Sequence, residues 1–402
     1  MQARLNVSSS TDDAPVVAYV QQLLEQAVNL KASDLHFEPY EHQYRVRMRI
    51  DGELREVASP HMALKDRLAS RIKVMSRLDI AEKRLPQDGR MKLQLVQGRE
   101  LDLRVSTLPT LFGEKLVIRV LDSAQAQLDL GRLGYEPEDL ERLLAAIRAP
   151  HGLVLVTGPT GSGKTQSLYA CLNLLNTPEV NIATVEDPCE IQLMGINQVN
   201  VQDKPGLSFA VALRAFLRQD PDILMVGEVR DLETANIAIQ AAQTGHLVLS
   251  TLHTNDAPAT LVRLRNMGTA PYNIAASVSL ITAQRLVRCL CPHCKRSTHL
   301  CATSLIKAGW PENLCPADTV PVFEPVGCAQ CHKGFAGRTG IFQVMPVSAA
   351  MQQLVLQQAG IQEMDRQARM EGVKSLRMAG LRKVLQGITS LDEVLAATRE
   401  SA

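Results

Sequence analysis

The feature that most constrains this sequence is a short glycine-rich segment near the middle of the chain. It matches the pattern GxxxxGK[ST] and consists of Gly158, Pro159, Thr160, Gly161, Ser162, Gly163, Lys164 and Thr165. An apolar run typical of a buried strand, 153–156, comes directly before it, and a helical pattern, 165–175, follows. Glycines at such a junction let backbone N–H groups close around a phosphate at a helix N-terminus. The segment predicts a nucleotide-phosphate loop, and the alternative is a glycine turn that binds no nucleotide.

Three more strand-like runs end in side chains that could act on a phosphate. The run 182–185 is followed by Glu186 and Asp187, the run 222–226 by Gly227 and Glu228, and the run 247–252 by His253. In open α/β sheets, ligands bind outside the carboxyl ends of the strands. The glycine-rich loop also follows a strand. We therefore expect all four groups to meet in one crevice.

ATP hydrolysis requires a carboxylate that orients or deprotonates water, and donors near the γ-phosphate. Lys164 is expected to reach the β- and γ-phosphates, and Thr165 to hold Mg²⁺. Glu228 is our choice for the base, with Glu186 assisting through water or metal. Each acidic group and histidine also has a structural alternative. Glu228 could pair with Arg230, Glu186 could belong to a surface turn, His246 could be a turn histidine after Gly245, and His253 could shape a loop with Asn255.

Length and patterning predict more than one domain. A chain of 402 residues is long for one core, and 46% apolar residues are enough to bury two. Residues 1–122 combine a helical pattern at 12–30 with alternating stretches at 34–38, 44–50 and 91–122, which predicts a small α+β domain with a turn near Gly98. Residues 123–131 resemble a linker. Residues 132–402 alternate strands and helices, which predicts a parallel α/β sheet, and become mainly helical from 343.

Charge and hydropathy exclude some function classes. The formal net charge of +1 argues against a chain-wide basic surface for nucleic acid or anionic lipid. No apolar run reaches the roughly 18 residues of a membrane-spanning helix, and the first ten residues lack a signal peptide's apolar stretch. We therefore expect a cytoplasmic protein whose membrane contact goes through partners.

Two arginines of the first domain are candidates for a catalytic role. Arg90 lies in QDGR and Arg104 in DLRV. A neighbouring subunit can supply an arginine to the γ-phosphate, which accelerates hydrolysis by about 10³–10⁵. The alternative is that both are solvated strand arginines.

Four cysteines form two CxxC pairs, Cys291 with Cys294 and Cys328 with Cys331. Two such pairs can give four thiolates to one tetrahedral Zn²⁺, although the spacer between them is longer than the commonest range. A redox CxxC would require a thioredoxin-like context, which does not surround these pairs. A metal-free reduced cluster is the other alternative. We expect a zinc-binding subdomain over 287–340.

Taken together, the motifs resemble those of the secretion ATPases that drive type II secretion and type IV pilus extension. Besides the glycine-rich loop, TVEDPCEI at 184–191 is similar to the family's Asp box, and RQDPDILMVGEVRD at 218–231 to its glutamate-type Walker B motif. TGHLVLSTLHTNDA at 244–257 is similar to its His box. RLPQDGR at 84–90 and DLRVSTLP at 102–109 also fit. The resemblance covers nearly the whole chain.

The resemblance implies a RecA-like P-loop ATPase domain preceded by a PAS-like domain, assembled as a homo-hexamer. ATP, Mg²⁺ and Zn²⁺ would be its cofactors, and an inner-membrane platform protein its partner. It implies that Glu186, His246 and His253 surround the γ-phosphate, and that Arg90 and Arg104 reach nucleotide from the first domain. The family's usual far N-terminal docking domain is not expected in this chain.

Two other functions remain open at this point. RecA-like hexamers also move nucleic acid, but the near-neutral charge and 3% aromatic residues leave few stacking platforms, so we expect no direct nucleic-acid partner. A non-catalytic nucleotide-binding scaffold would not need Lys164, Glu228 and His253 intact.

Overall fold

The computed structural model describes residues 14–95, 100–121, 128–202, 204–312 and 318–399. The chain divides into two compact units, Met1–Ala126 and Gln127–Ala402. Most of the linker expected at 123–131 and the turn expected at Gly98 lie outside the described residues. Leu130–Arg132 form a 3-10 turn capped by Asp129, so the second unit begins within that expected linker. None of the described helices combines the length and apolar character needed to span a bilayer.

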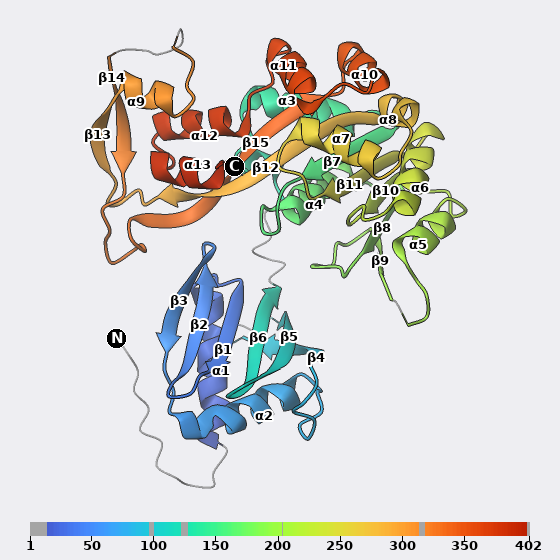
Figure 1. Ribbon diagram of the computed structural model, residues 1–402. Helices are drawn as coiled ribbons and strands as arrows, with labels where there is room; N and C mark the ends of the chain where they lie inside the picture. The colour runs from blue at the N-terminus through green and yellow to red at the C-terminus, as the bar shows by residue number, and fades with distance from the viewer. Residues whose placement is uncertain (1–13, 96–99, 122–127, 203, 313–317, 400–402) are drawn as a thin grey trace. The chain divides into compact units, whose positions relative to one another are not determined.

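The first unit is an antiparallel sheet with two main helices (Figure 1). In chain order its elements are α1 (Ala14–Asn29), β1 (Asp34–Pro39), β2 (Tyr44–Ile50), β3 (Glu53–Ala58), a 3-10 turn (Met62–Leu64), α2 (Lys65–Met75), β4 (Gln87–Gln94), β5 (Glu100–Thr110) and β6 (Gly113–Leu121). The strand order is β3-β2-β1-β6-β5-β4. The predicted alternating stretches are therefore strands, although the last series begins at Gln87 rather than Met91.

One face of this sheet is apolar because successive side chains of a strand point to opposite faces. In β2, Val46 and Met48 are fully buried, and the arginines that alternate with them (Arg45, Arg47 and Arg49) lie on the other face. Helices α1 and α2 contribute Leu24 and Ile72 to the same buried cluster. At the end of β2, Asp51 and Gly52 have positive φ angles of 52° and 89°, the conformation that a tight hairpin turn requires.

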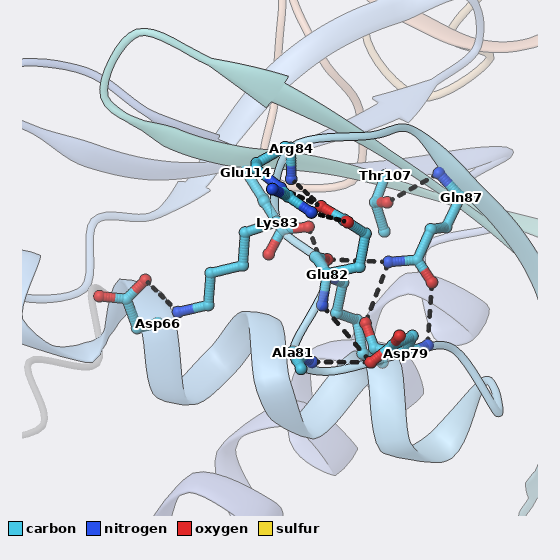
Figure 2. Close-up of polar contacts among 10 residues, drawn as sticks. Asp66, Asp79, Ala81, Glu82, Lys83, Arg84, Gln87, Thr107 and Glu114 are labelled. Carbon is cyan, nitrogen blue, oxygen red and sulfur yellow. Dashed lines mark hydrogen bonds and ion pairs between the residues drawn. The ribbon is translucent and has the colours of Figure 1, made fainter.

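Polar contacts fix the loop between α2 and β4 (Figure 2). The Gln87 amide accepts from the backbone N–H of Asp79 at 2.9 Å and donates to its carbonyl at 3.0 Å. The buried Lys73 donates to the Glu82 carbonyl at 2.7 Å and pairs with Glu114 at 2.5 Å. Gln87 is the first residue of β4, so these contacts fix where the strand that carries Arg90 begins.

The second unit contains the predicted parallel sheet. Its first half comprises α3 (Pro137–Ile147), β7 (Gly152–Thr157), α4 (Lys164–Leu175), β8 (Ile182–Glu186), β9 (Asn197–Asn200), α5 (Phe209–Phe216), β10 (Ile223–Val226), α6 (Leu232–Gln243) and β11 (Leu247–Leu252). There follow α7 (Ala257–Asn266), α8 (Pro271–Ser277), β12 (Val278–Leu290) and β15 (Phe335–Pro346). The strand order is β15-β12-β7-β11-β10-β8-β9, and only β15 runs antiparallel to its neighbour.

Helices cover both faces of this sheet, which explains its continuous apolar strands. Leu153 and Leu155 of β7 face one cluster, with side chains of α5, α6 and α7. Val154 and Val156 face the other, with α3 and α4. All six residues of β7 are buried, so the loop that follows extends from a rigid strand.

The cysteine segment and the last helices pack together. Strands β13 (Arg296–Cys301) and β14 (Thr319–Glu324) form a hairpin, with α9 (Ala302–Lys307) between them. Helices α12 (Leu376–Leu385) and α13 (Leu391–Ala397) share a hydrophobic cluster with this hairpin, and Figure 1 shows them beside it. Helices α10 (Ala349–Leu356) and α11 (Ile361–Met370) precede them. The helical region therefore begins at Ala349 rather than at 343, because β15 continues to Pro346.

Candidate nucleotide site

The glycine-rich loop joins β7 to α4. Gly158, Gly161 and Gly163 have positive φ angles of 151°, 79° and 89°, which other residues rarely adopt. The Lys164 ammonium lies across the loop and donates to the carbonyls of Gly158 at 2.9 Å and Pro159 at 3.1 Å. Burial lowers the pKa of Lys164, and the negative charge of Glu228 opposes that shift. The lysine is therefore already placed over the space that the loop encloses.

The neighbouring strand β12 holds the loop in place through hydrogen bonds of Gln284. The Gln284 side chain donates to the Ser162 carbonyl at 2.7 Å and accepts from the Ser167 hydroxyl at 2.8 Å. A Cβ on Gly158 would lie 2.5 Å from the Gln284 carbonyl oxygen. The first glycine is therefore required by close backbone approach as well as by its φ angle.

Glu228 follows β10 at the same edge of the sheet. Its carboxylate lies 3.4 Å from His253 Nε2 and also contacts Arg230, which pairs with Asp187 at 3.1 Å. The parallel register of β8, β10 and β11 brings these groups together, as predicted from the strand ends. The Arg230 contact that we considered as an alternative for Glu228 is also present.

Glu186 lies in a closed environment. Its carboxylate is only 4% exposed and accepts hydrogen bonds from the hydroxyls of Tyr169 and Thr184 and from the Gln198 amide. These donors satisfy a buried carboxylate. The Tyr169 hydroxyl also accepts from the backbone N–H of Glu190 at 3.1 Å.

Glu190, which our sequence reasoning did not select, has the exposed position. Thr165 donates to its carboxylate at 3.3 Å. The Asp-box-like segment therefore presents Glu190 to the loop threonine and buries Glu186. Helical spacing could have indicated this role for Glu190. Tyr169 follows Thr165 by about one turn of α4, so both side chains lie on the same face of the helix and both contact this segment.

His246 corrects one sequence expectation. It precedes β11, whereas His253 follows it, and the six strand residues between them place the two about 23 Å apart along the strand. Its carbonyl accepts from the N–H of Gly152 at the start of β7, and its ring Nδ1 lies 3.0 Å from the Ala241 carbonyl. Within this chain, His246 therefore lies at the opposite edge of the sheet from Lys164 and is a satisfied turn histidine.

Arg90 and Arg104 are direct cross-strand partners on β4 and β5 of the first unit. Arg90 is exposed and Arg104 is half-buried. Their common position on the sheet means that both side chains lie on the same face, opposite the apolar core.

The four predicted cysteines converge. The sulfur atoms of Cys291, Cys294, Cys328 and Cys331 all lie within 4.8 Å of one another. The sulfur atoms of Cys291 and Cys328 are 3.9 Å apart, and that of Cys331 lies 3.6 Å from those of Cys294 and Cys328. A tetrahedral ion with Zn–S bonds of about 2.3 Å would separate its sulfurs by about 3.8 Å, so the residues fit zinc. Backbone N–H groups also donate to two sulfurs, Gly327 to Cys294 (3.3 Å) and Cys328 to Cys331 (3.2 Å). Each such bond lowers the pKa of the thiol that accepts it, although burial raises the pKa of Cys294 overall.

Comparison with known proteins supplies the family. Residues 9–396 match the family model described as type II/IV secretion system protein. The chain belongs to this family. The type IV pilus assembly ATPase PilB of Acinetobacter baylyi is 56% identical over 97% of this chain and 67% of its own length. The type II secretion system ATPase E of Vibrio cholerae is 48% identical over 98% of this chain and 77% of its own.

Two solved structures share the fold of this secretion ATPase. The ATPase DotB of Legionella pneumophila has a TM-score of 0.70 at 20% identity, covering 94% of this chain and 95% of its own. The pilus retraction motor PilT with bound ADP has a TM-score of 0.62 at 22% identity, covering 95% and 97%. At these identities the likeness concerns the fold alone.

Proposed function

We propose that this secretion ATPase hydrolyses ATP to ADP and phosphate to power assembly of a type IV pilus or a type II secretion pseudopilus. The observation that carries the proposal is the meeting of Lys164, Glu228 and His253 at one edge of the parallel sheet. Relatives named for pilus assembly are 51–56% identical, and those named for type II secretion 46–49%, which favours the pilus.

The chemistry divides among residues of this edge. Backbone N–H groups of the loop and Lys164 would bind the β- and γ-phosphates. Thr165 would hold Mg²⁺, with Glu190 close enough to contact the ion's water shell, and the ion would neutralise developing charge. Glu228 would accept a proton from the attacking water. The water oxygen would bond to the γ-phosphorus while the bond between that phosphorus and the ADP oxygen breaks. His253 would hold the Glu228 carboxylate and donate towards the transferred phosphate.

Glu186 has a supporting part in this proposal. Because three side-chain donors already surround it, it would fix the segment that carries Glu190 rather than contact the nucleotide. We do not include His246 in the phosphate site.

The first unit would complete the site in a ring. We propose that it is PAS-like, and that Arg90 and Arg104 act on nucleotide within a homo-hexamer. Their shared position on the polar sheet face supports this. The hexamer would act in the cytoplasm on an inner-membrane platform protein, with no direct contact to nucleic acid.

Zn²⁺ bound by the four cysteines would be structural. All four thiolates would be used as ligands, which leaves no open position for chemistry. The β13–β14 hairpin, which lies between the two cysteine pairs, packs on α12 and α13. Metal binding would therefore stabilise the C-terminal helices.

The test is the steady-state ATPase rate per chain against protein concentration, with size analysis on the same samples. We expect the rate to rise as a hexamer forms. Lys164→Ala should lose nucleotide binding, and Glu228→Gln should retain binding but lose turnover. Glu233→Gln, which changes an exposed glutamate of α6 that pairs with Arg214 of α5, is the matched control. Wild-type turnover by Glu228→Gln would disprove the assignment of the base.

A further inference from the structure

Strand β12 brings a cation to the nucleotide edge that neither the glycine-rich loop nor the strand-end motifs include. Ala283 of β12 is in register with Thr157, the last residue of β7. Arg285 therefore lies two residues beyond the end of β7, alongside the beginning of the loop. Gln284, directly before it, already supports the loop.

The hydrogen-bond acceptors of Arg285 are neutral. Its guanidinium donates to the carbonyl of Gln284 at 3.1 Å, and to the carbonyl and side-chain oxygen of Asn255 at 3.3 and 3.0 Å. Asp256 is near enough for its charge to raise the pKa of Arg285, but burial outweighs it and lowers that pKa. The Asp256 carboxylate also accepts from the N–H of Ala259 at 2.7 Å, as the cap of α7.

Arg285 and Lys164 are close enough for their charges to interact. Burial is the main cause that lowers the pKa of Lys164; the charge of Glu228 opposes it, and the positive charge of Arg285 lowers the pKa further. Two partly desolvated cations beside one loop repel each other, and an anion between them would relieve that repulsion. The charges of Glu228 and Glu190 also act on Lys164, and that of Asp256 acts on Arg285. A nucleotide phosphate would add negative charge between the two cations.

Asn255 places the cation near the terminal phosphate. It belongs to the segment after β11, in which His253 lies beside Glu228 and Thr254 donates its N–H to Thr157 Oγ1 at 3.0 Å. One short segment therefore connects the ends of β10, β7 and β12. The guanidinium that Asn255 holds therefore lies at the same strand ends as His253 and Glu228, where the proposed site would bind the γ-phosphate.

We propose that Arg285 binds the terminal phosphate of ATP from the same subunit, and that Asn255 is the residue that positions it. This inference rests on the proposed nucleotide site. It adds a cation in cis to those expected from a neighbouring first unit. Because the fork of a guanidinium matches a phosphate in two bonds, Arg285 would distinguish ATP from ADP.

The experiment measures Kd for ATP and ADP with a fluorescent nucleotide, in the presence of Mg²⁺, on the full chain. In Arg285→Gln, ATP binding should weaken about tenfold or more, and ADP binding should change less than about twofold. Arg285→Lys should recover part of the ATP affinity. Asn255→Ala should weaken ATP binding in the same selective way but less. Arg265→Gln, another half-buried arginine bonded to a carbonyl, is the matched control.

The outcomes separate this inference from the proposed function. Unchanged ATP binding in Arg285→Gln, or an equal loss for ATP and ADP, would overturn it while Lys164→Ala still loses nucleotide. If the wild-type chain bound no nucleotide, the proposed function itself would fail.

Discussion

Removing the Tyr169 hydroxyl should lower the stability of the folded chain. The hydroxyl donates to the buried Glu186 and accepts from the Glu190 N–H, so Tyr169→Phe removes both bonds and keeps the ring. A hydrogen bond to a charged group contributes about 1.5–3 kcal/mol, and a stranded partly buried N–H costs about 1 kcal/mol more. We expect about 2–4 kcal/mol of destabilisation. Burial raises the pKa of Tyr169, and the charge of Glu186 raises it further, so the hydroxyl stays protonated and donating at neutral pH.

Thermal unfolding of the full chain measures this effect. For domains of 150–250 residues, 1 kcal/mol shifts Tm by about 2–4 °C, so the variant should melt roughly 4–16 °C lower. Tyr272→Phe is the matched control, because that side chain is 66% exposed and should leave Tm unchanged. The Mg²⁺ concentration for half-maximal activity should rise in Tyr169→Phe, because Glu190 contacts Thr165. Equal melting of the two variants would refute the reasoning.

Three further predictions concern other parts of the chain. Gly158→Ala should weaken nucleotide binding tenfold or more in an equilibrium titration, because its Cβ would meet the Gln284 carbonyl at 2.5 Å. Gly245→Ala, with a φ of +102° and open space, should leave binding intact. Metal analysis should find about one zinc per chain, and chelation should lower Tm; folded protein of unchanged Tm without metal would contradict this. Burial raises the pKa of Glu38, but hydrogen bonds from Arg47, Lys115 and Arg45 outweigh it and hold the pKa at about 2. Its folded-state pKa is thus depressed, so its contribution, about 2–3 kcal/mol, is present above about pH 4.5 and lost towards pH 2. In Glu38→Gln, the free energy of unfolding in urea should fall less steeply between about pH 4.5 and pH 2 than in the wild-type chain. An unchanged pH profile would contradict this.

Local pattern was sufficient for several features of the site. A strand, a glycine loop and a helix are contiguous, so Lys164 and Thr165 could be placed from the sequence. Glu228 and His253 could be placed because the carboxyl ends of parallel strands share an edge. The same rule, applied to strand direction, would have placed His246 at the opposite edge, because it comes before its strand.

The cysteines illustrate what residue identity can and cannot decide. Two CxxC pairs predicted a metal cluster, but a spacer of 33 residues, 295–327, does not bring them together by itself. The antiparallel pairing of β13 with β14, in which Arg296 lies opposite Glu324, brings the flanking cysteine pairs together.

By itself, the sequence determined the glycine-rich loop between a strand and a helix, the parallel sheet and the edge at which Glu228 and His253 gather, because each depends on neighbouring residues and on strand direction. Only the tertiary structure decided which carboxylate is buried and which faces Thr165, since Glu186 and Glu190 differ in the partners supplied by α4 and β9. It also decided that Gln284 and Arg285 belong to the site. They follow the loop by more than a hundred residues, and pairing of β12 with β7 alone brings them to it.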